Sequence, residues 1–345
     1  VPYGPSGSTN GAPLGIAFDA DTGELWVRNA TGWFNSGDPA TGTNPGVTIG
    51  SGTFFAAGSG YQNDSRDHFN FGNRPFAHTP PAGFEPLSTA GAPDVAITNP
   101  SDHFTTILDT GANILTNAQA TFPNGLWWIK DRANQNQHQL VDSVRGATEA
   151  CQNPSQTTTT YSAPAGNSVA WCWNLLADRS NGFDIVTYNG TGNAHTVPHN
   201  LSQAPEFIVI FNRDRGQNRG VYHVSRGPTK ALLLDTSLGE QTATYYWNDT
   251  APTAGNFSVG TWNGVNGSGE RHVAYCWHSV PGYSAIGSYQ GNGSADGPFI
   301  YTGFRPAFVL LKSSSHSHPW ILMDSQRDQY NVANKVLKSD SNAEE

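Results

Sequence analysis

The chain has 345 residues, of which only 13% are charged, and its formal net charge at pH 7 is −9. This acidic balance has no basic stripe, so nucleic acid is excluded as a partner. No apolar run approaches the roughly 18 residues of a membrane helix, which excludes membrane insertion. The 38 glycines and 22 prolines, with few Leu, Lys and Glu, favour short strands and tight turns over helices.

The region up to about residue 100 has its own pattern. Residues 14–34 predict a strand, a turn and a second strand. The turn "DADTGE" (19–24) resembles a loose calcium loop, although a hairpin turn explains it more simply. In "FNFGNRPF" (69–76), Phe69 and Phe71 share one face of a strand. We expect both rings to fill a sandwich core.

The rest of the chain repeats itself. Three stretches open alike, as "TTILDTGAN" from Thr105, "FDIVTYNGTGN" from Phe183 and "SAIGSYQGNGS" from Ser284. An apolar strand follows each opening, and after it comes a segment that contains an arginine. The distance from Ile185 to Arg226 is 41 residues, as is the distance from Ile286 to Arg327. This agreement predicts three related β-modules.

The first two modules close with one more strand each, "SVAWCWN" (168–174) and "HVAYCWH" (272–278). At the same offset, the third closing strand would fall beyond Glu345. We therefore expect that the last module lacks this strand, that the chain is a fragment, or that another chain completes the sheet. Since the first residue is Val1 and not Met, we also expect a processed, trimmed or partial chain.

The cysteines Cys151, Cys172 and Cys276 are odd in number and widely spaced. They predict no disulfide framework and no Cys-x-x-Cys metal knuckle. Because Cys172 and Cys276 each lie between an aromatic residue and a Trp, we expect both thiols to be buried in cores.

Residues 15–88 resemble the second half of a SPRY-type, concanavalin-like β-sandwich. The resemblance rests on "GIAFDADTGELWVRN", "GDPATGTNP" and "HFNFGNRPFAHTPPAGFEPL". The version here is similar to those of virion proteins of tailed bacteriophages. The downstream segments "FDIVTYNGTGNAHTVPHNL", "APEFIVIFNR" and "GNGSADGPFIYTGFRPAFVLLK" resemble a β-module associated with the same proteins. Residues 1–13 are too few to complete a SPRY unit.

The predicted fold is all-β, with tandem antiparallel β-sandwich modules of jelly-roll or concanavalin type and almost no helix. The weak exception is "YNVANKVLKSD" (330–340). The predicted divisions are listed in chain order: a partial SPRY-like sandwich (1–90), a linker (91–103), module 1 (104–180), module 2 (181–283) and an incomplete module 3 (284–345).

An enzyme that cleaves polysaccharide needs two carboxylates roughly 5–9.5 Å apart across a sugar. Candidates are Asp142, Asp235, Glu240 and Asp324. Asp142 and Asp324 recur at matching positions near an arginine, which favours structural carboxylate–arginine pairs. No Gly-x-Ser-x-Gly or His-Glu-x-x-His motif is present. We predict no catalytic residue and no enzyme activity.

Sugar binding is favoured by aromatic residues beside Asn, Asp and Gly, because rings stack on sugar C–H patches and amides bind hydroxyls. The predicted carbohydrate-binding residues are Trp247, Asn248, Trp262 and Asn263, with a place in the core or a subunit interface as the alternative for both tryptophans. His316 and His318 lie on one side of an extended segment, but an exposed loop is the simpler interpretation. We predict no metal and no cofactor.

The resemblance implies a structural protein of a tailed-phage virion, such as a tail fibre or another appendage. Such a protein would contribute to assembly and to attachment to host-surface glycans. Its partners would be copies of itself, for example in a trimer, and other virion proteins. The alternatives are a polysaccharide-degrading enzyme on the phage particle, a capsid decoration protein and a bacterial surface adhesin.

Overall fold

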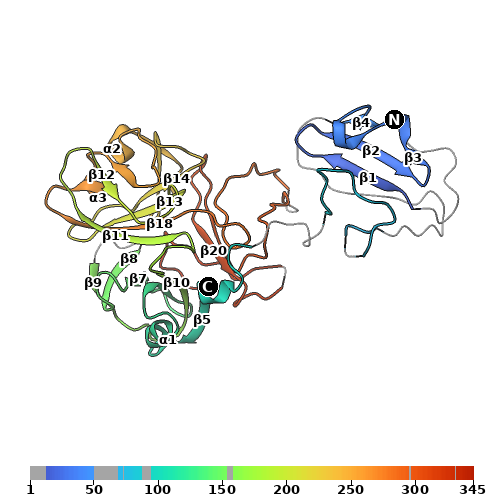
Figure 1. Cartoon of the computed structure of the whole chain (residues 1–345). Helices are drawn as coiled ribbons and strands as arrows, with labels where there is room; N and C mark the ends of the chain where they lie inside the picture. Colours follow the sequence, from blue (N-terminus) through green and yellow to red (C-terminus); the bar gives the residue numbers. More distant parts are fainter. Residues whose placement is uncertain are drawn as a thin grey trace. The chain divides into compact units, whose positions relative to one another are not determined.

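The structure is a computed structural model that describes residues 13–49, 69–72, 74–87, 95–153, 158–294, 297–330 and 332–345. The chain forms two compact units, Val1–Asp94 and Val95–Glu345 (Figure 1). The described strands pair in antiparallel sheets and the described helices are short, which confirms the predicted all-β class. The predicted linker lies partly outside the described residues, and its described part includes the short helix η3 (Pro100–Asp102).

The first unit contains a four-stranded sheet. Strand β1 (Gly15–Asp19) pairs with β2 (Glu24–Asn29), and β2 also pairs with β3 (Gly32–Trp33) and β4 (Val47–Thr48). This confirms the predicted strand–turn–strand. Two 3-10 turns, η1 (Phe34–Ser36) and η2 (Pro39–Thr41), join β3 to β4.

Trp26 is the buried anchor of this sheet, with 1% of its surface exposed. Its indole N–H donates to the Thr43 carbonyl at 2.9 Å, and Phe84 packs edge-on against its ring. The contact with Thr43 fixes the loop before β4, because a buried indole N–H needs an acceptor.

The predicted core role of Phe69 and Phe71 is wrong. The rings do stack, with centroids 5.9 Å apart, but they are 49% and 38% exposed. Residues 69–72 form no strand. The Asn70 carboxamide instead accepts the N–H groups of Gly72 and Arg74, which closes the segment into a loop.

Module 1 forms one six-stranded sheet of order β5-β10-β6-β7-β8-β9. A short helix, α1 (Ile114–Thr121), follows the first strand. The strands of the module 1 sheet are β5 (Phe104–Thr110), β6 (Gly125–Asp131), β7 (His138–Asp142), β8 (Glu149–Asn153), β9 (Thr158–Thr160) and β10 (Asn167–Asn174).

Module 2 repeats this topology, with order β11-β18-β13-β14-β15-β16. Its sheet strands are β11 (Phe183–Asn189), β13 (Phe207–Asn212), β14 (Gly220–His223), β15 (Lys230–Leu233), β16 (Gln241–Thr242) and β18 (Arg271–Trp277). A separate ribbon and two one-turn helices lie between them in sequence: β12 (His195–Pro198), α2 (Thr244–Trp247), β17 (Asn256–Val259) and α3 (Asn263–Asn266).

Module 3 has a two-stranded sheet, β19 (Phe308–Leu311) and β20 (Ile321–Asp324). Leu322 of β20 also forms a bridge with Leu337. The bridge matches the pairing of Val221 with Leu232 in module 2. The candidate helix at 330–340 is therefore wrong, since Leu337 lies in the place of a third strand.

The three modules share one central core, a cluster of buried apolar side chains. Strand β6 contributes Leu126 and Trp128, and β13 contributes Val209 and Phe211. Module 3 adds Trp320, Leu322 and Leu337. Because side chains alternate along a strand, these residues all lie on one face of their sheets, and those faces pack against one another. The sandwich therefore forms between modules, whereas the sequence predicted a sandwich within each.

The opposite face of each six-stranded sheet is also covered. Trp127 and Ile129 of β6 pack with the helix α1, while Ile208 and Ile210 of β13 pack beneath β12, β17, α2 and α3. Figure 1 shows α1 and the α2–α3 layer on opposite sides of the paired sheets. Cover on both faces explains why β6 reads as a continuous apolar run.

The predicted burial of Cys172 and Cys276 is confirmed, since both are 0% exposed and free. Burial raises the pKa of both thiols above the ordinary value. Each thiol belongs to the outer apolar layer of its sheet, so small size is what the position requires.

Candidate functional site: the open edge of module 3

An arginine corner ends β7, the second strand of the β6–β7 hairpin of module 1. One Asp142 oxygen accepts the backbone N–H groups two and three residues on, at 3.0 and 2.8 Å, and the other accepts Arg145 Nε at 2.5 Å. Asp324 and Arg327 repeat this arrangement in module 3. All four side chains are 0% exposed. The predicted structural carboxylate–arginine pairs are confirmed.

Each of these corners also receives a hydrogen bond from another module. The Tyr275 hydroxyl of module 2 donates to Asp142 Oδ2 at 2.8 Å, and burial raises the pKa of this phenol well above its ordinary value. Trp171 Nε1 of module 1 donates to Asp324 Oδ2 at 2.9 Å. Tyr275 and Trp171 occupy matching places in "AYCW" and "AWCW", so two equivalent bonds join the modules.

The corner of module 2 differs. His223 stands where the other corners have Asp, and its Nδ1 accepts the Ser225 N–H at 3.1 Å. Burial lowers its pKa, with an opposing contribution from a hydrogen bond to the Gly287 backbone. Arg226 pairs with Glu240 at 2.7 Å. By the order of the other two corners, an aromatic side chain from module 3 would face His223.

A second set of inter-module hydrogen bonds has all three members. In each, a side chain at or just before the start of the second hairpin strand, which is β7, β14 or β20, donates to a carbonyl of another module. The three bonds are His138 Nε2 to Lys338 O at 2.9 Å, Arg219 Nη2 to Gln152 O at 3.2 Å and Trp320 Nε1 to Leu233 O at 2.8 Å. The modules therefore follow one another in a closed cycle, and the aromatic set has two donors, Trp171 and Tyr275, among the described residues.

Module 3 exposes strand surface that modules 1 and 2 bury. Every residue of β6 is buried, and five of the six residues of β13 are buried. No residue of β19 is buried. In the described chain β19 pairs with β20 alone, whereas β6 and β13 each lie between two strands. The free side of β19 is the open edge of module 3.

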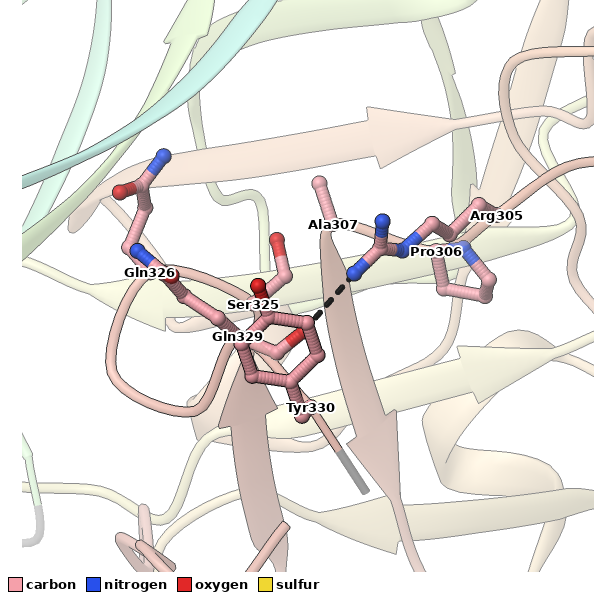
Figure 2. Close-up of a pocket in the computed structure, with 7 residues that line it drawn as sticks. All are labelled: Arg305, Pro306, Ala307, Ser325, Gln326, Gln329 and Tyr330. Carbon is pink, nitrogen blue, oxygen red and sulfur yellow. Dashed lines mark hydrogen bonds between the residues drawn. The ribbon is translucent and has the colours of Figure 1, made fainter. Parts of the chain in front are cut away.

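A hollow of about 360 Å³ lies at the Phe308 end of this hairpin. Figure 2 shows its lining, in which an Arg305 guanidinium N–H donates to the Gln329 carbonyl at 2.8 Å. Tyr330 lies beside it and is 83% exposed. The remaining lining residues are Pro306, Ala307, Ser325 and Gln326. An exposed ring beside amides can contact either a sugar or a peptide.

The residues of the hollow correspond to positions that modules 1 and 2 use for their closing strands. Glu206, the counterpart of Ala307, donates its N–H to the Trp277 carbonyl at 2.8 Å. At Gly125, the counterpart in module 1, an added Cβ would lie 2.1 Å from the Trp173 carbonyl oxygen. Only glycine tolerates such an approach. In both modules, the closing strand ends beside this position.

The predicted carbohydrate-binding residues lie on α2 and α3, which the structure brings together through a hydrogen bond from Trp262 N–H to the Tyr245 carbonyl at 3.0 Å. Trp247 is 1% exposed, and its indole donates to the Lys230 carbonyl at 2.9 Å. Because both faces of the ring are within the outer core, stacking of a sugar on Trp247 is corrected to a packing role. Asn248 is exposed and ends α2 in a left-handed conformation.

Trp262 is half-buried, with its ring against Gly264 and edge-on to Tyr246 at 5.0 Å. Asn263 is exposed. Tyr245, which the sequence did not single out, is 44% exposed and lies next to them. Its position in "ATYYW" could have identified it, because one of two adjacent tyrosines at the start of a helical turn points outward.

The carboxylates proposed for polysaccharide cleavage have internal partners. Asp235 accepts the backbone N–H of Arg219 at 3.0 Å, and Glu240 pairs with Arg226 and Lys230. Together with the two corner aspartates, all four candidates serve contacts within the second unit. Their geometry favours structural roles.

Buried Lys130 has the lowered pKa, to about 8, that often marks catalytic lysines, and burial is the main cause. Its ammonium donates to the carbonyls of Asn136 at 2.6 Å and Asn342 at 3.1 Å, with a longer contact to Asn134. These bonds tie the segment near residue 342 to module 1, so Lys130 has a structural role.

The described residues contain no group of three or more His, Cys, Asp or Glu side chains that could hold a metal ion. The His316 and His318 rings lie 6.4 Å apart. At "DADTGE", one Asp19 oxygen accepts the N–H groups of Asp21 and Thr22, as in a hairpin turn. Among the described helices, none has the length and apolar character to cross a bilayer.

Two stretches of the chain, residues 99–170 and 153–345, match a protein family described as a domain of unknown function (DUF7483). No curated protein and no solved structure matches the chain. The matched stretches contain all three modules.

Proposed function

Because the chain belongs to the DUF7483 family, whose function is unknown, we propose a role from its own architecture. It is a non-enzymatic structural protein of a tailed-phage particle, in a tail fibre or another appendage. The observation that carries this proposal is the open edge of module 3 beside two closed modules. The counterparts of β19, which are β6 and β13, lie inside their sheets, whereas β19 has a free side in the described chain. Such an edge is suited to joining another segment.

The internal pairing of the four candidate carboxylates also supports a structural role over the enzymatic alternative. A glycosidase needs a carboxyl group with access to its substrate on each side of the scissile bond. In this chain, Asp142 and Asp324 have fully buried side chains. Release of reducing ends from host polysaccharide by the purified full chain would contradict the proposal.

Membership of a particle is tested by immunogold electron microscopy of purified phage with antibodies to the full chain. Label on tails or fibres is the expected result. Label spread over the capsid would make the protein a decoration protein. Label on bacterial cells alone would favour a surface adhesin and overturn the virion assignment.

A second role, attachment to host glycans, is favoured by the surface that Tyr245, Trp262 and Asn263 form on α2 and α3. Tyr245→Ala combined with Asn263→Ala should weaken binding to host cells about tenfold, the effect of losing one stacked ring and one amide. Tyr289→Ala is the matched control, because Tyr289 is 52% exposed in module 3. Equal loss in both variants would contradict a site on α2 and α3.

A further inference from the structure

We propose that the open edge of module 3 binds one antiparallel β-strand from outside residues 1–345, and that this strand carries the Ala-aromatic-Cys-Trp pattern of β10 and β18. The inference rests on the proposed structural function and names the partner of the same site. It follows from the register, the direction of the free N–H groups and the incomplete set of inter-module bonds.

The register of the absent strand is given twice in the molecule. In module 1, Leu126, Trp127 and Trp128 lie opposite Trp173, Cys172 and Trp171. In module 2, the first three residues of β13 lie opposite Trp277, Cys276 and Tyr275. The module 3 counterparts are Phe308, Val309 and Leu310, since each module pairs its two hairpin strands in the same way. They would face Trp, Cys and an aromatic residue in that order.

Backbone donors on β19 point toward the open edge. In module 3, Ser325 N–H donates to the Ala307 carbonyl around the pair Phe308–Asp324. This makes the pair a widely spaced one, so Phe308 and Leu310 direct their N–H and C=O groups away from β20. Val224 and Glu206 form the same bond in module 2, where the corresponding groups face β18.

The aromatic position of the bound strand faces His223. Since Nδ1 of His223 accepts the Ser225 N–H, its Nε2 carries the proton of a neutral ring and needs an acceptor. The Gly287 backbone serves in the structure, and the docked strand would replace it. A tyrosine hydroxyl accepts such a bond and an indole N–H does not. The partner strand therefore carries Tyr, as β18 does, in preference to Trp.

Residues 284–290 would gain a place in the completed sheet. Their counterparts β5 and β11 lie on the far side of the closing strands β10 and β18. In the structure, residues 285–290 form no strand, and Tyr289 is 52% exposed. A docked strand gives this segment the ladder it lacks, and the contact of Gly287 with His223 gives way to the new strand.

The strand is neither of the two closing strands that the chain already pairs, β10 and β18. The printed sequence contains Ala-aromatic-Cys-Trp twice, and both copies are already paired within β10 and β18. A second copy of the chain would have to open one of its own six-stranded sheets to donate either. A segment outside residues 1–345 that carries a third copy has no such cost.

The test uses the full chain and a fluorescent peptide with the sequence of residues 269–279, GERHVAYCWHS, carrying Cys276→Ala to prevent disulfides. We expect saturable 1:1 binding by fluorescence anisotropy. Hydrogen–deuterium exchange should show slower exchange at 308–311 and at 284–290. Absence of binding, or protection elsewhere alone, would overturn the inference.

Two N-methylated peptides are matched controls. In β18, Tyr275 directs its N–H to β13, while His278 N–H bonds Gly182 on the other side and sets Ala274 to face β11. N-methylation at Tyr275 should weaken binding at least tenfold more than N-methylation at Ala274. Equal effects would exclude pairing with β19. Particle labelling without peptide binding would leave the proposed function intact and reject this inference. Peptide binding without particle labelling would support this inference and reject the proposed function.

Discussion

Modules 2 and 3 contain closely related sequences in different structural states. "FDIVTYNGTGN" forms the strand β11 in module 2, whereas its counterpart "SAIGSYQGNGS" forms no strand after Ser284. Strand β13 is largely buried and β19 is not. The difference is the closing strand β18, which lies between β11 and β13. Local pattern specifies where a strand can form, and the neighbouring strand decides whether it does.

The largest expected effect comes from the arginine corners. Asp142→Asn takes from the buried Arg145 guanidinium its carboxylate at 2.5 Å and leaves only the half-buried Glu149 at 3.4 Å, so it should lower the free energy of unfolding by about 3–5 kcal/mol. His223→Gln at the matching corner of module 2 should cost about 1 kcal/mol or less. Urea denaturation of both variants checks the contrast, and equal losses would show that the two corners are equivalent.

Outer-face residues of β13 and β19 give a second comparison. Ile210 is 0% exposed, and Ile210→Ala should lower the free energy of unfolding by about 2–5 kcal/mol. Half-buried Leu311 is its counterpart, and Leu311→Ala should cost about 1 kcal/mol. Urea denaturation measures both losses. When it is repeated with the peptide of residues 269–279 bound, the two losses should become more similar. A large Leu311 loss in the free chain would show that β19 is already covered.

The bond that joins module 2 to module 1 is tested by Tyr275→Phe. Removal of the hydroxyl takes one donor from the buried Asp142 carboxylate, so the free energy of unfolding should fall by about 1.5–3 kcal/mol. Tyr301→Phe is the control, because Tyr301 is 80% exposed in module 3. Thermal denaturation that gives equal shifts for both variants would contradict a role for this bond.

The smallest expected effect is a pH dependence of stability that distinguishes the His138 bond from the equivalent bonds of Arg219 and Trp320. Burial lowers the pKa of His138 from 6.5 to about 3. The unfolded chain therefore binds the extra proton between these values, and stability falls as pH is lowered through this window, by up to about 1.4 kcal/mol per pH unit. Above pH 6.5 the imidazole is neutral in both the folded and the unfolded chain, so it no longer makes stability depend on pH.

His138→Gln should reduce the slope of unfolding free energy against pH between about pH 6.5 and 5. The exposed His316→Gln variant is the matched control for the loss of an imidazole. Part of the slope should remain in both, because burial also lowers the pKa of His199, His223 and His272. An unchanged slope in His138→Gln would mean that this imidazole titrates normally in the folded chain.

The sequence predicted the all-β class, the three modules and the paired roles of Asp142 and Asp324, because strand patterning and corner motifs are local. The shared core was not predicted, since alternation along β6 shows that both faces are apolar but not which module covers each. Trp247 shows the same limit: the pattern "YYWNDT" is compatible with exposure, whereas tertiary packing buries the indole. The helix α1 was missed because its eight residues include Thr and Asn, which favour helices weakly.

The closed cycle of bonds between modules has a consequence for folding during synthesis. His138 bonds the carbonyl of Lys338, 200 residues later, and Trp171 bonds Asp324, 153 residues later. At about 5–20 residues per second, the ribosome delivers Lys338 about 10–40 s after His138. Until the last module emerges, the His138 and Trp171 side chains of module 1 therefore have no bond to module 3. Such high contact order predicts slow, late and concerted folding, and a nascent chain that benefits from chaperones.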